Sequence, residues 1–534
     1  MNAPEVLVLA MLVTCVLVTL SRRFEVPNSI IILLGGVLLG LMPFAGALAI
    51  APENMLLVFL PPLLMEAAYF TSLRDFRKNL RPILQLAVGL VLITGVAVAF
   101  VFQLIVPGAG WAVGFVLGAI ISPPDVVAAT SVIKKMSVPK RISTILEGES
   151  LVNDAMGLVM YKFAVAAVVT SQFSLVEAGG QFLWMIISGV AVGLVVGFVF
   201  VRLFPRIQDL PIEILGTFVI PYLSYILAEE VHGSGVLAVV ITGLYVGWHS
   251  PTLFTPRFRI PAEAVWRMVS FVLSALVFIL IGLQIPALFE RLSVYTPSFL
   301  LGSAAAICAT VVVLRFIYVF MVAYGTRCIF STIREHETNY AWQNVLLVAY
   351  VGMRGVVSLA TALALPLSVM DGSAFPHRDL ILFLALAVIV FTLVVQGLLL
   401  PFIVRRLTLS YDSNALYEDW FARISAARRA MEKLEDIEFS GTAHSPALMR
   451  IKSHYQERIE SLGDGPNTPL VPTETPDSMN HPILQAENRI WHEVLQVERE
   501  VLIGLRKAYQ IGDDVLHDIT RELDLLETRF EHRA

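Results

Sequence analysis

Charge is scarce in this chain. Only 15% of its 534 residues are Asp, Glu, Lys or Arg, whereas 57% are hydrophobic, and the mean hydropathy is +0.75. Soluble domains carry about 25% charged residues. The composition therefore excludes an ordinary soluble domain and predicts an all-α polytopic membrane protein, with the lipid bilayer as its surroundings.

Cysteine is nearly absent as well. The three cysteines, Cys15, Cys308 and Cys328, lie within or at the edge of apolar spans and form no CxxC pair. This pattern excludes a disulfide framework and a cysteine metal cage. The sequence also lacks a Gly-rich phosphate loop, an HExxH and a GxSxG motif. We therefore expect no enzyme activity, no cofactor and no nucleic-acid partner.

The first apolar run, from Val6 to Leu20, has no basic residue before it, and Arg22 and Arg23 follow it. A cleavable signal peptide has the opposite arrangement, with its positive charge in front. We therefore expect a retained membrane helix whose N-terminus lies outside.

Hydropathy separates about thirteen apolar spans. They lie near residues 5–21, 28–42, 54–71, 82–106, 110–133, 143–170, 180–204, 212–231, 235–249, 265–289, 298–328, 341–367 and 379–404. The loops on one side hold nearly all basic residues: Arg22, Arg23, Arg74, Arg77, Lys78, Arg81, Lys134, Lys135, Lys140, Arg141, Arg202, Arg206, Arg257, Arg259, Arg327, Arg334, Arg405 and Arg406. The opposite loops contain only Arg291 and Arg378. The positive-inside rule predicts a cell-membrane protein with its C-terminus in the cytoplasm.

Two spans are interrupted by residues that break helices. The fifth contains SPPD, from Ser122 to Asp125, and the twelfth contains Gly352-Met353-Arg354-Gly355. We expect two consecutive prolines to interrupt a helix, and broken backbone at membrane depth is tolerated only where protein covers it or where it lines a cavity. Spans 1–6 and 8–13 place these breaks at matching positions. The pattern predicts two inverted six-helix repeats with discontinuous helices 5 and 12 and a site at the bilayer midplane.

The apolar character ends near Leu409. We expect a transmembrane domain over residues 1–408 and a helical cytoplasmic tail over 409–534. Helical patterns in the tail cover about 412–438, 446–462, 483–511 and 513–530, with a Pro/Thr-rich linker around 463–482. Mixed charge on these helices is typical of a regulatory or assembly module.

Residues 147–154, EGESLVND, bring polar groups into an apolar run. Ser150 and Asp154 share one helix face, and Glu149 and Asn153 share another, because each pair is four residues apart. An ionised group at the centre of a membrane helix costs about 3 kcal/mol or more, so such residues are retained where they bind an ion, carry a proton or pair. The ionisable residues expected within spans are Glu66, Asp125, Glu149, Asp154, Arg315 and Arg354, with Glu229 and Glu230 nearer an outside end.

These residues allow distinct roles. Carbonyls freed by the Pro-Pro break can join Asp125 in coordinating a small cation. Mutual pairing is the cheapest state for Glu149 and Arg354, which predicts a structural ion pair that braces the two broken helices. Asp154, with Asp125 as a second candidate, is then left to exchange a proton for a monovalent cation. Glu66 is an open case, since it could join the site or hydrogen-bond a backbone break.

The motifs SPPDVVAA, LEGESLVNDA and GMRGVVSLA, in this order, resemble those of the NhaP/NHE-type monovalent cation–proton antiporters. The similarity also covers residues 60–69, 228–243 and 277–284. The resemblance implies a homodimer with an ion-transporting core and an interface domain. It implies that Asp154 exchanges the cation and proton, Asp125 and the Ser150 hydroxyl contribute ligands, and Asn153 stabilises the site. It also implies that Glu149 and Arg354 form the structural pair and that Glu66 approaches the ion. Many members have Thr where this chain has Pro124, so a side-chain ligand is replaced by a backbone carbonyl alone.

We therefore expect a secondary antiporter, with a role in pH homeostasis, that exchanges Na⁺, Li⁺ or K⁺ for H⁺ by alternating access. One titrating carboxylate beside a neutral Asn predicts electroneutral exchange. A K⁺-preferring exchanger remains an alternative, because oxygen ligands do not separate the two ions. A membrane sensor of pH or cations that does not transport is a rival from another class. A channel is disfavoured, because broken helices at pseudo-symmetric positions are typical of rocking transport.

Overall fold

The computed structural model describes residues 11–19, 28–42, 52–125, 138–170, 175–207, 209–325, 341–370, 372–407, 413–439, 446–463 and 481–531. These residues form helices and, apart from one isolated bridge between Ser368 and Ala374, no β-structure. Several residues named in the sequence predictions lie outside the described residues, as does the predicted domain boundary between residues 408 and 409: Arg22, Arg23, Lys134, Lys135, Arg327, Arg334 and Cys328.

The helices of the apolar part follow the expected spans closely. They are α2 (Asn28–Gly40), α3 (Pro52–Tyr69), α4 (Leu73–Lys78), α5 (Leu80–Leu84), π-helix η2 (Gln85–Leu90), α6 (Val91–Ile105), α7 (Trp111–Ile121), α9 (Lys140–Thr170), α10 (Leu175–Leu203), α11 (Leu210–Glu230), α12 (Gly235–Leu253), α13 (Pro256–Arg291), α14 (Pro297–Phe320), η5 (Met321–Gly325), α17 (Trp342–Tyr350), α18 (Val356–Leu363), α19 (Arg378–Phe391), η6 (Thr392–Gln396) and α20 (Gly397–Arg406). Short 3-10 turns η3 (Phe204–Arg206) and η4 (Leu292–Val294) follow α10 and α13.

Eight of the described helical stretches are long and apolar enough to cross a membrane, and three shorter apolar helices accompany them. The protein is therefore a multi-pass membrane protein, as its composition predicts. Both expected interruptions are present. Helix α7 ends at Ile121, directly before Ser122 and the two prolines, and α17 and α18 are separated by residues 351–355.

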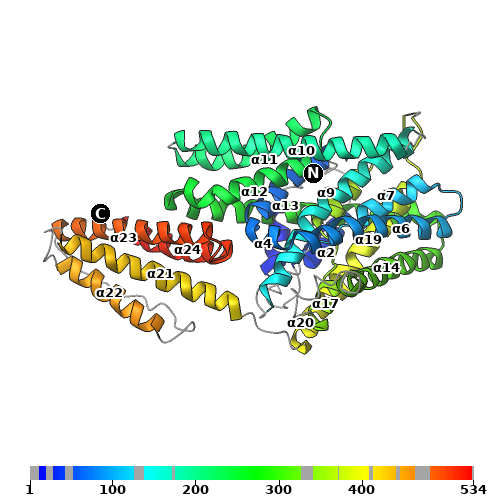
Figure 1. Cartoon of the computed structure of the whole chain (residues 1–534). Helices are drawn as coiled ribbons and strands as arrows, with labels where there is room; N and C mark the ends of the chain where they lie inside the picture. The colour runs from blue at the N-terminus through cyan, green and yellow to red at the C-terminus, as the bar shows by residue number, and fades with distance from the viewer. Residues whose placement is uncertain are drawn as a thin grey trace.

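The helices pack in groups that surround α9. Helices α10, α11 and α12 lie side by side along one edge of the bundle, with α3 against α12 (Figure 1). On the other side α9 packs on α7 and on the α5–η2 segment, and α6 and α7 pack on each other. The α6–α7 contact requires glycine, because a Cβ added at Gly118 would lie 2.6 Å from the carbonyl oxygen of Gly95. Helix α9 is thus the element shared by both groups.

The four remaining helices, α21 (Ser413–Ile437), α22 (Pro446–Gly463), α23 (His481–Lys507) and α24 (Asp513–Glu531), agree with the helical patterns of the tail. They pack around an apolar cluster of their own that includes Leu434, Val494 and Ile519. Inside it, Arg458 donates to Glu498 at 3.0 Å. Burial raises the pKa of the Glu498 carboxyl, and Arg458 acts in the opposite direction.

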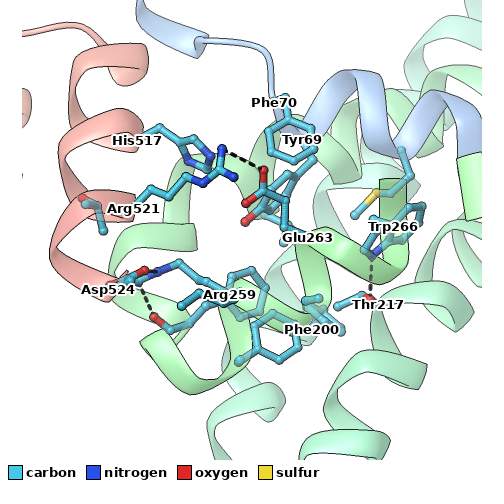
Figure 2. A pocket seen from close by; sticks show the side chains of 17 residues that line it. Tyr69, Phe70, Phe200, Thr217, Arg259, Glu263, Trp266, His517, Arg521 and Asp524 are labelled. Atoms are coloured by element: carbon cyan, nitrogen blue, oxygen red, sulfur yellow. Dashed lines mark hydrogen bonds and ion pairs between the residues drawn. The ribbon is translucent and has the colours of Figure 1, made fainter. Parts of the chain in front are cut away.

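These helices contact the membrane part at several places, among them α12, where the Nη1 of Arg506 donates to the carbonyl oxygen of Trp248 at 2.9 Å. On α13, Arg259 donates to both carboxylate oxygens of Asp524 of α24, each at 2.6 Å (Figure 2). On the other side, the Nζ of Lys140, the first residue of α9, lies 3.2 Å from a carboxylate oxygen of Asp514. A pocket lined by aromatic side chains, Tyr69 and Trp266 among them, lies between α24 and α13 (Figure 2). The docked tail therefore marks one face of the membrane part.

Candidate ion-binding site

The polar cluster predicted on residues 147–154 lies in the middle of α9, a continuous helix of 31 residues. Glu149 and Asn153 are completely buried, and Asp154 is 6% exposed. Ser150 is half-buried on the same helix face as Asp154. The charges of this cluster are thus held inside the protein, as the sequence predicts.

The unwound segment after α7 places Asp125 beside the second broken helix. Its backbone N–H donates to the carbonyl oxygen of Met353 at 2.7 Å, and its carboxylate accepts from the N–H of Val356 at 3.1 Å. Val356 is the first residue of α18, so the carboxylate lies at the positive end of that helix. The carboxylate occupies the space that a Cβ on Gly355 would need. Glycine at 355 is therefore required for this contact.

Arg354, from the break between α17 and α18, contacts the end of α7. It is 1% exposed, and its Nε donates to the carbonyl oxygen of Ile121, the last residue of α7, at 2.6 Å. Its Nη1 donates to the carbonyl oxygen of Gly352 at 2.8 Å, and its backbone N–H donates to the Thr392 hydroxyl at 3.0 Å. Helix ends leave carbonyls without partners, and a cation there also complements the helix dipole. The cation of Arg354 thus caps the C-terminus of α7, and the anion of Asp125 caps the N-terminus of α18, where the two broken helices meet.

The predicted ion pair between Glu149 and Arg354 is wrong. Glu149 pairs with Arg315 of α14, whose Nη1 and Nη2 donate to its carboxylate oxygens at 2.6 and 3.1 Å. Arg315 also donates to the carbonyl oxygens of Val348 and Val351 at 3.0 and 2.7 Å. The physical reason is that each helix break frees backbone carbonyls. The Arg354 guanidinium donates to the carbonyl at the end of α7, whereas the Arg315 guanidinium reaches the carbonyls at the end of α17 and the Glu149 carboxylate at the same time. Arg354 remains within electrostatic range of Glu149.

Asn153 joins α9 to the first unwound segment. Its Nδ2 donates to the carbonyl oxygen of Pro124 at 3.1 Å. Its Oδ1 and the hydroxyl of Ser122 are buried without a hydrogen-bond partner among the described residues. Buried oxygens of this kind are normally satisfied by a partner, water or an ion. Asp125 and Asp154 are close enough to interact electrostatically, so carboxylate, amide, hydroxyl and carbonyl oxygens converge here.

The described residues hold no cluster of three or more His, Cys, Asp or Glu that could bind a metal ion. The oxygen set is therefore unlike a transition-metal centre and suits a hard cation with few charged ligands.

The described contacts of Glu66 do not include Asp125, Asn153 or Asp154. It is half-buried on α3, close to Ser270 and Arg267 of α13. Its approach to a bound ion, and the part of the Ser150 hydroxyl, remain predictions.

Sequence reasoning also missed contributors. The sequence places Arg315 within an apolar span but does not identify it as the partner of Glu149. Thr392, whose hydroxyl accepts from the backbone N–H of Arg354, lies in an apolar run and gives no sequence signal. Lys162, in the same helix as Asp154, was overlooked although a lone lysine in an apolar span is a visible signal. It contacts Glu229 at 2.6 Å.

Fold and site define a helical membrane transporter with buried carboxylates at the crossing of two broken helices. The comparisons agree with this class. Residues 7–406 match the family described as sodium/hydrogen exchanger, transmembrane. The chain therefore belongs to the sodium/hydrogen exchanger family, whose members are transporters and not enzymes.

Individual relatives and a solved structure extend the match. The chain is 30% identical to the uncharacterized Na⁺/H⁺ exchanger YjcE of Escherichia coli, with 96% of this chain and 95% of that protein covered. It is 29% identical to the sodium, potassium, lithium and rubidium/H⁺ antiporter of Bacillus subtilis, covering 97% of this chain and 77% of that protein. The fold is similar to that of the sodium proton antiporter MjNhaP1 from Methanocaldococcus jannaschii, with a TM-score of 0.57 at 18% identity, covering 76% of this chain and 98% of that one.

Proposed function

We propose that this protein exchanges Na⁺ for H⁺ across the cell membrane, with Asp154 as the carboxylate that cation and proton occupy in turn. The observation that carries the proposal is the buried Oδ1 of Asn153, which has no hydrogen-bond partner among the described residues. Asn153 precedes Asp154 in α9, and its Nδ2 reaches the carbonyl oxygen of Pro124, the residue before Asp125. A bare cation bound there gains oxygens that are otherwise unsatisfied. A proton on Asp154 removes the charge that attracts the cation, so the two occupants exclude each other.

Asp125 has a different part in this scheme. Its carboxylate is already engaged by the backbone N–H of Val356, so we assign it to attracting the cation and holding the crossing together. A single exchanging carboxylate gives one cation per proton and no net charge moved. Ser150, the carbonyl of Pro124 and Glu66 are proposed as further oxygen ligands.

The ion preference has a second candidate. The name of the Bacillus subtilis relative includes potassium, lithium and rubidium beside sodium, and oxygen ligands accept all of them. K⁺/H⁺ exchange is therefore the alternative. The sensor reading is disfavoured, because the family to which the chain belongs consists of exchangers.

The remaining architecture is proposed from the sequence pattern. It consists of about thirteen spans in two inverted repeats, a homodimer, an outside N-terminus and a regulatory cytoplasmic domain over residues 409–534. Two broken helices are present, with α7 ending before SPPD and α17 separated from α18, and broken helices of this kind support the proposal of alternating access around a fixed site. The physiological role that fits is control of cytoplasmic pH.

The deciding experiment is exchange in proteoliposomes, read as a change of internal pH on addition of Na⁺, Li⁺ or K⁺ at several pH values. Asp154→Asn keeps the side-chain volume, removes the shared charge and should abolish exchange. Glu290→Gln, a change at an exposed carboxylate on α13, is the matched control and should exchange normally. A folded Asp154→Asn protein that still changes the internal pH on addition of Na⁺ would contradict the proposal.

A further inference from the structure

Helix α9 also carries Lys162, a charge that the ion-binding site does not use. The Nζ of Lys162 donates to both carboxylate oxygens of Glu229, each at 2.6 Å. Glu229 lies in the last turn of α11, and it also accepts from the backbone N–H of Gly235, the first residue of α12, at 3.2 Å. The carboxylate is thus fixed at the positive end of α12. Lys162 of α9 therefore pairs with a carboxylate that is held in place at the turn between α11 and α12.

This ion pair closes one end of a seam between α9 and the α11–α12 unit. Leu151, Ala155, Leu158 and Lys162 follow one another at spacings of four, three and four residues, so they lie on one helix face. The first three are buried in an apolar cluster with residues of α3, α11 and α12 that include Leu60, Tyr225, Val236 and Val240. Lys162 continues that face where it becomes half-exposed, at 35% of its side chain.

Asp154 lies next to this seam, between its two ends. Asp154, Leu158 and Lys162 are spaced by four residues, so Lys162 is about 12 Å further along the helix axis. In the other direction α9 begins at Lys140, which contacts Asp514 of the docked tail. A route along the seam from Asp154 to the face opposite the tail therefore passes Leu158 and then the pair of Lys162 and Glu229.

On the basis of the antiport proposed above, we propose that Lys162 and Glu229 form the latch that closes the ion pathway between Asp154 and the face opposite the docked tail. Exchange requires the site to open to one face at a time. In this structure the latch is formed, so the pathway to that face is shut. When α9 moves away from the α11–α12 turn, the Glu229 carboxylate loses its ammonium partner and is exposed to an arriving cation.

The test uses a cysteine as a reporter of access. Leu158→Cys is placed in a background in which Cys15, Cys308 and Cys328 are replaced by serine. The rate of labelling by a membrane-impermeant maleimide is measured in intact cells and in inverted vesicles, so that each face is probed separately. Ala155→Cys is the second reporter, should the first variant fail to fold.

Opening the latch should raise the labelling rate from the face opposite the tail. Lys162→Gln and Glu229→Gln should each raise it about fivefold, the order of bias that a partly exposed ion pair exerts. Lys162→Arg keeps the cation and should retain the protection. The matched control is Arg291→Gln, which removes a pair with Asp379 at 3.7 Å that joins α13 to α19 and not the seam.

Unchanged labelling in Lys162→Gln and Glu229→Gln would overturn the latch, as would an equal rise in Arg291→Gln. Labelling needs no transport, so it reports on the latch independently of the antiport proposal. Exchange by the parent protein and by Asp154→Asn, measured on the same preparations, reports on the antiport proposal alone.

Discussion

The pair of Glu149 and Arg315 gives the sharpest prediction about what holds the site together. Their side chains are 0% and 3% exposed, and both guanidinium nitrogens of the contact reach the carboxylate. Removing one partner of a buried pair leaves an uncompensated charge and typically costs about 3–5 kcal/mol. Each single variant, Glu149→Gln and Arg315→Gln, should therefore lower the free energy of unfolding by that order.

The structure ranks the two variants. Without Glu149, Arg315 still donates to the carbonyls of Val348 and Val351, so the loss should be near 3 kcal/mol, the lower end of that range. Without Arg315, both the carboxylate and those carbonyls lose their partner. Hydrogen bonds to charged groups contribute about 1.5–3 kcal/mol each, so the loss should approach or exceed the upper end. The double variant buries no lone charge and should fall short of the additive loss by about 3 kcal/mol or more.

The assay is reversible unfolding of the purified protein in mixed micelles with increasing detergent denaturant. The control cycle pairs Glu149→Gln with Arg354→Gln, residues that interact electrostatically but share no hydrogen bond in the described contacts. Its coupling should stay below about 1 kcal/mol. Additive losses for Glu149 and Arg315, or a larger coupling for Glu149 and Arg354, would refute the assignment of the partners.

Three further outcomes are expected. Gly355→Ala forces the Asp125 carboxylate away from the N-terminus of α18 and should lower the exchange rate in proteoliposomes more than tenfold, whereas Gly302→Ala, which meets no atom within 4 Å, should not; equal rates would contradict the role of Asp125. Asp524→Asn removes the charge that binds Arg259 and should speed proteolytic release of the tail severalfold in a limited-digestion time course, with the exposed Asp436→Asn as control; unchanged digestion would show that this contact does not hold the tail. Truncation after Arg406 should leave an exchanging protein with a shifted pH profile or maximal rate, and a folded truncated protein without exchange between about pH 5 and 9 would show that the tail is essential.

The sequence predicted those features that depend on local chemistry. Two consecutive prolines disfavour a continuous helix because they lack N–H donors, and α7 ends at Ile121 directly before the SPPD motif. Pro61 and Pro62 nevertheless lie inside the continuous helix α3, so a Pro-Pro pair alone does not place a helix end. The GMRG interruption likewise separates α17 from α18 as expected. The polar face of α9 followed from four-residue spacing alone.

The partner of Glu149 could not be derived in this way. Two arginines of like burial, Arg315 and Arg354, compete for one carboxylate. The outcome depends on which frayed helix end each guanidinium reaches, a matter of three-dimensional packing that spacing does not encode. Lys162 was different: its partner Glu229 lies 67 residues away, but the lone charge itself was visible.

The crossing of the two broken helices also sets an order for biosynthesis. Asp125 and its backbone partner Val356 are separated by 231 residues, and Glu149 and Arg315 by 166. At about 5–20 residues per second, the carboxylates of the first half leave the ribosome roughly 10–50 s before their partners. The first half therefore waits in the bilayer with its acidic groups unpaired, and its insertion has to be secured by the apolar spans around them. Substitutions that weaken those early spans should reduce the amount of protein in the membrane even where they leave the finished site unchanged.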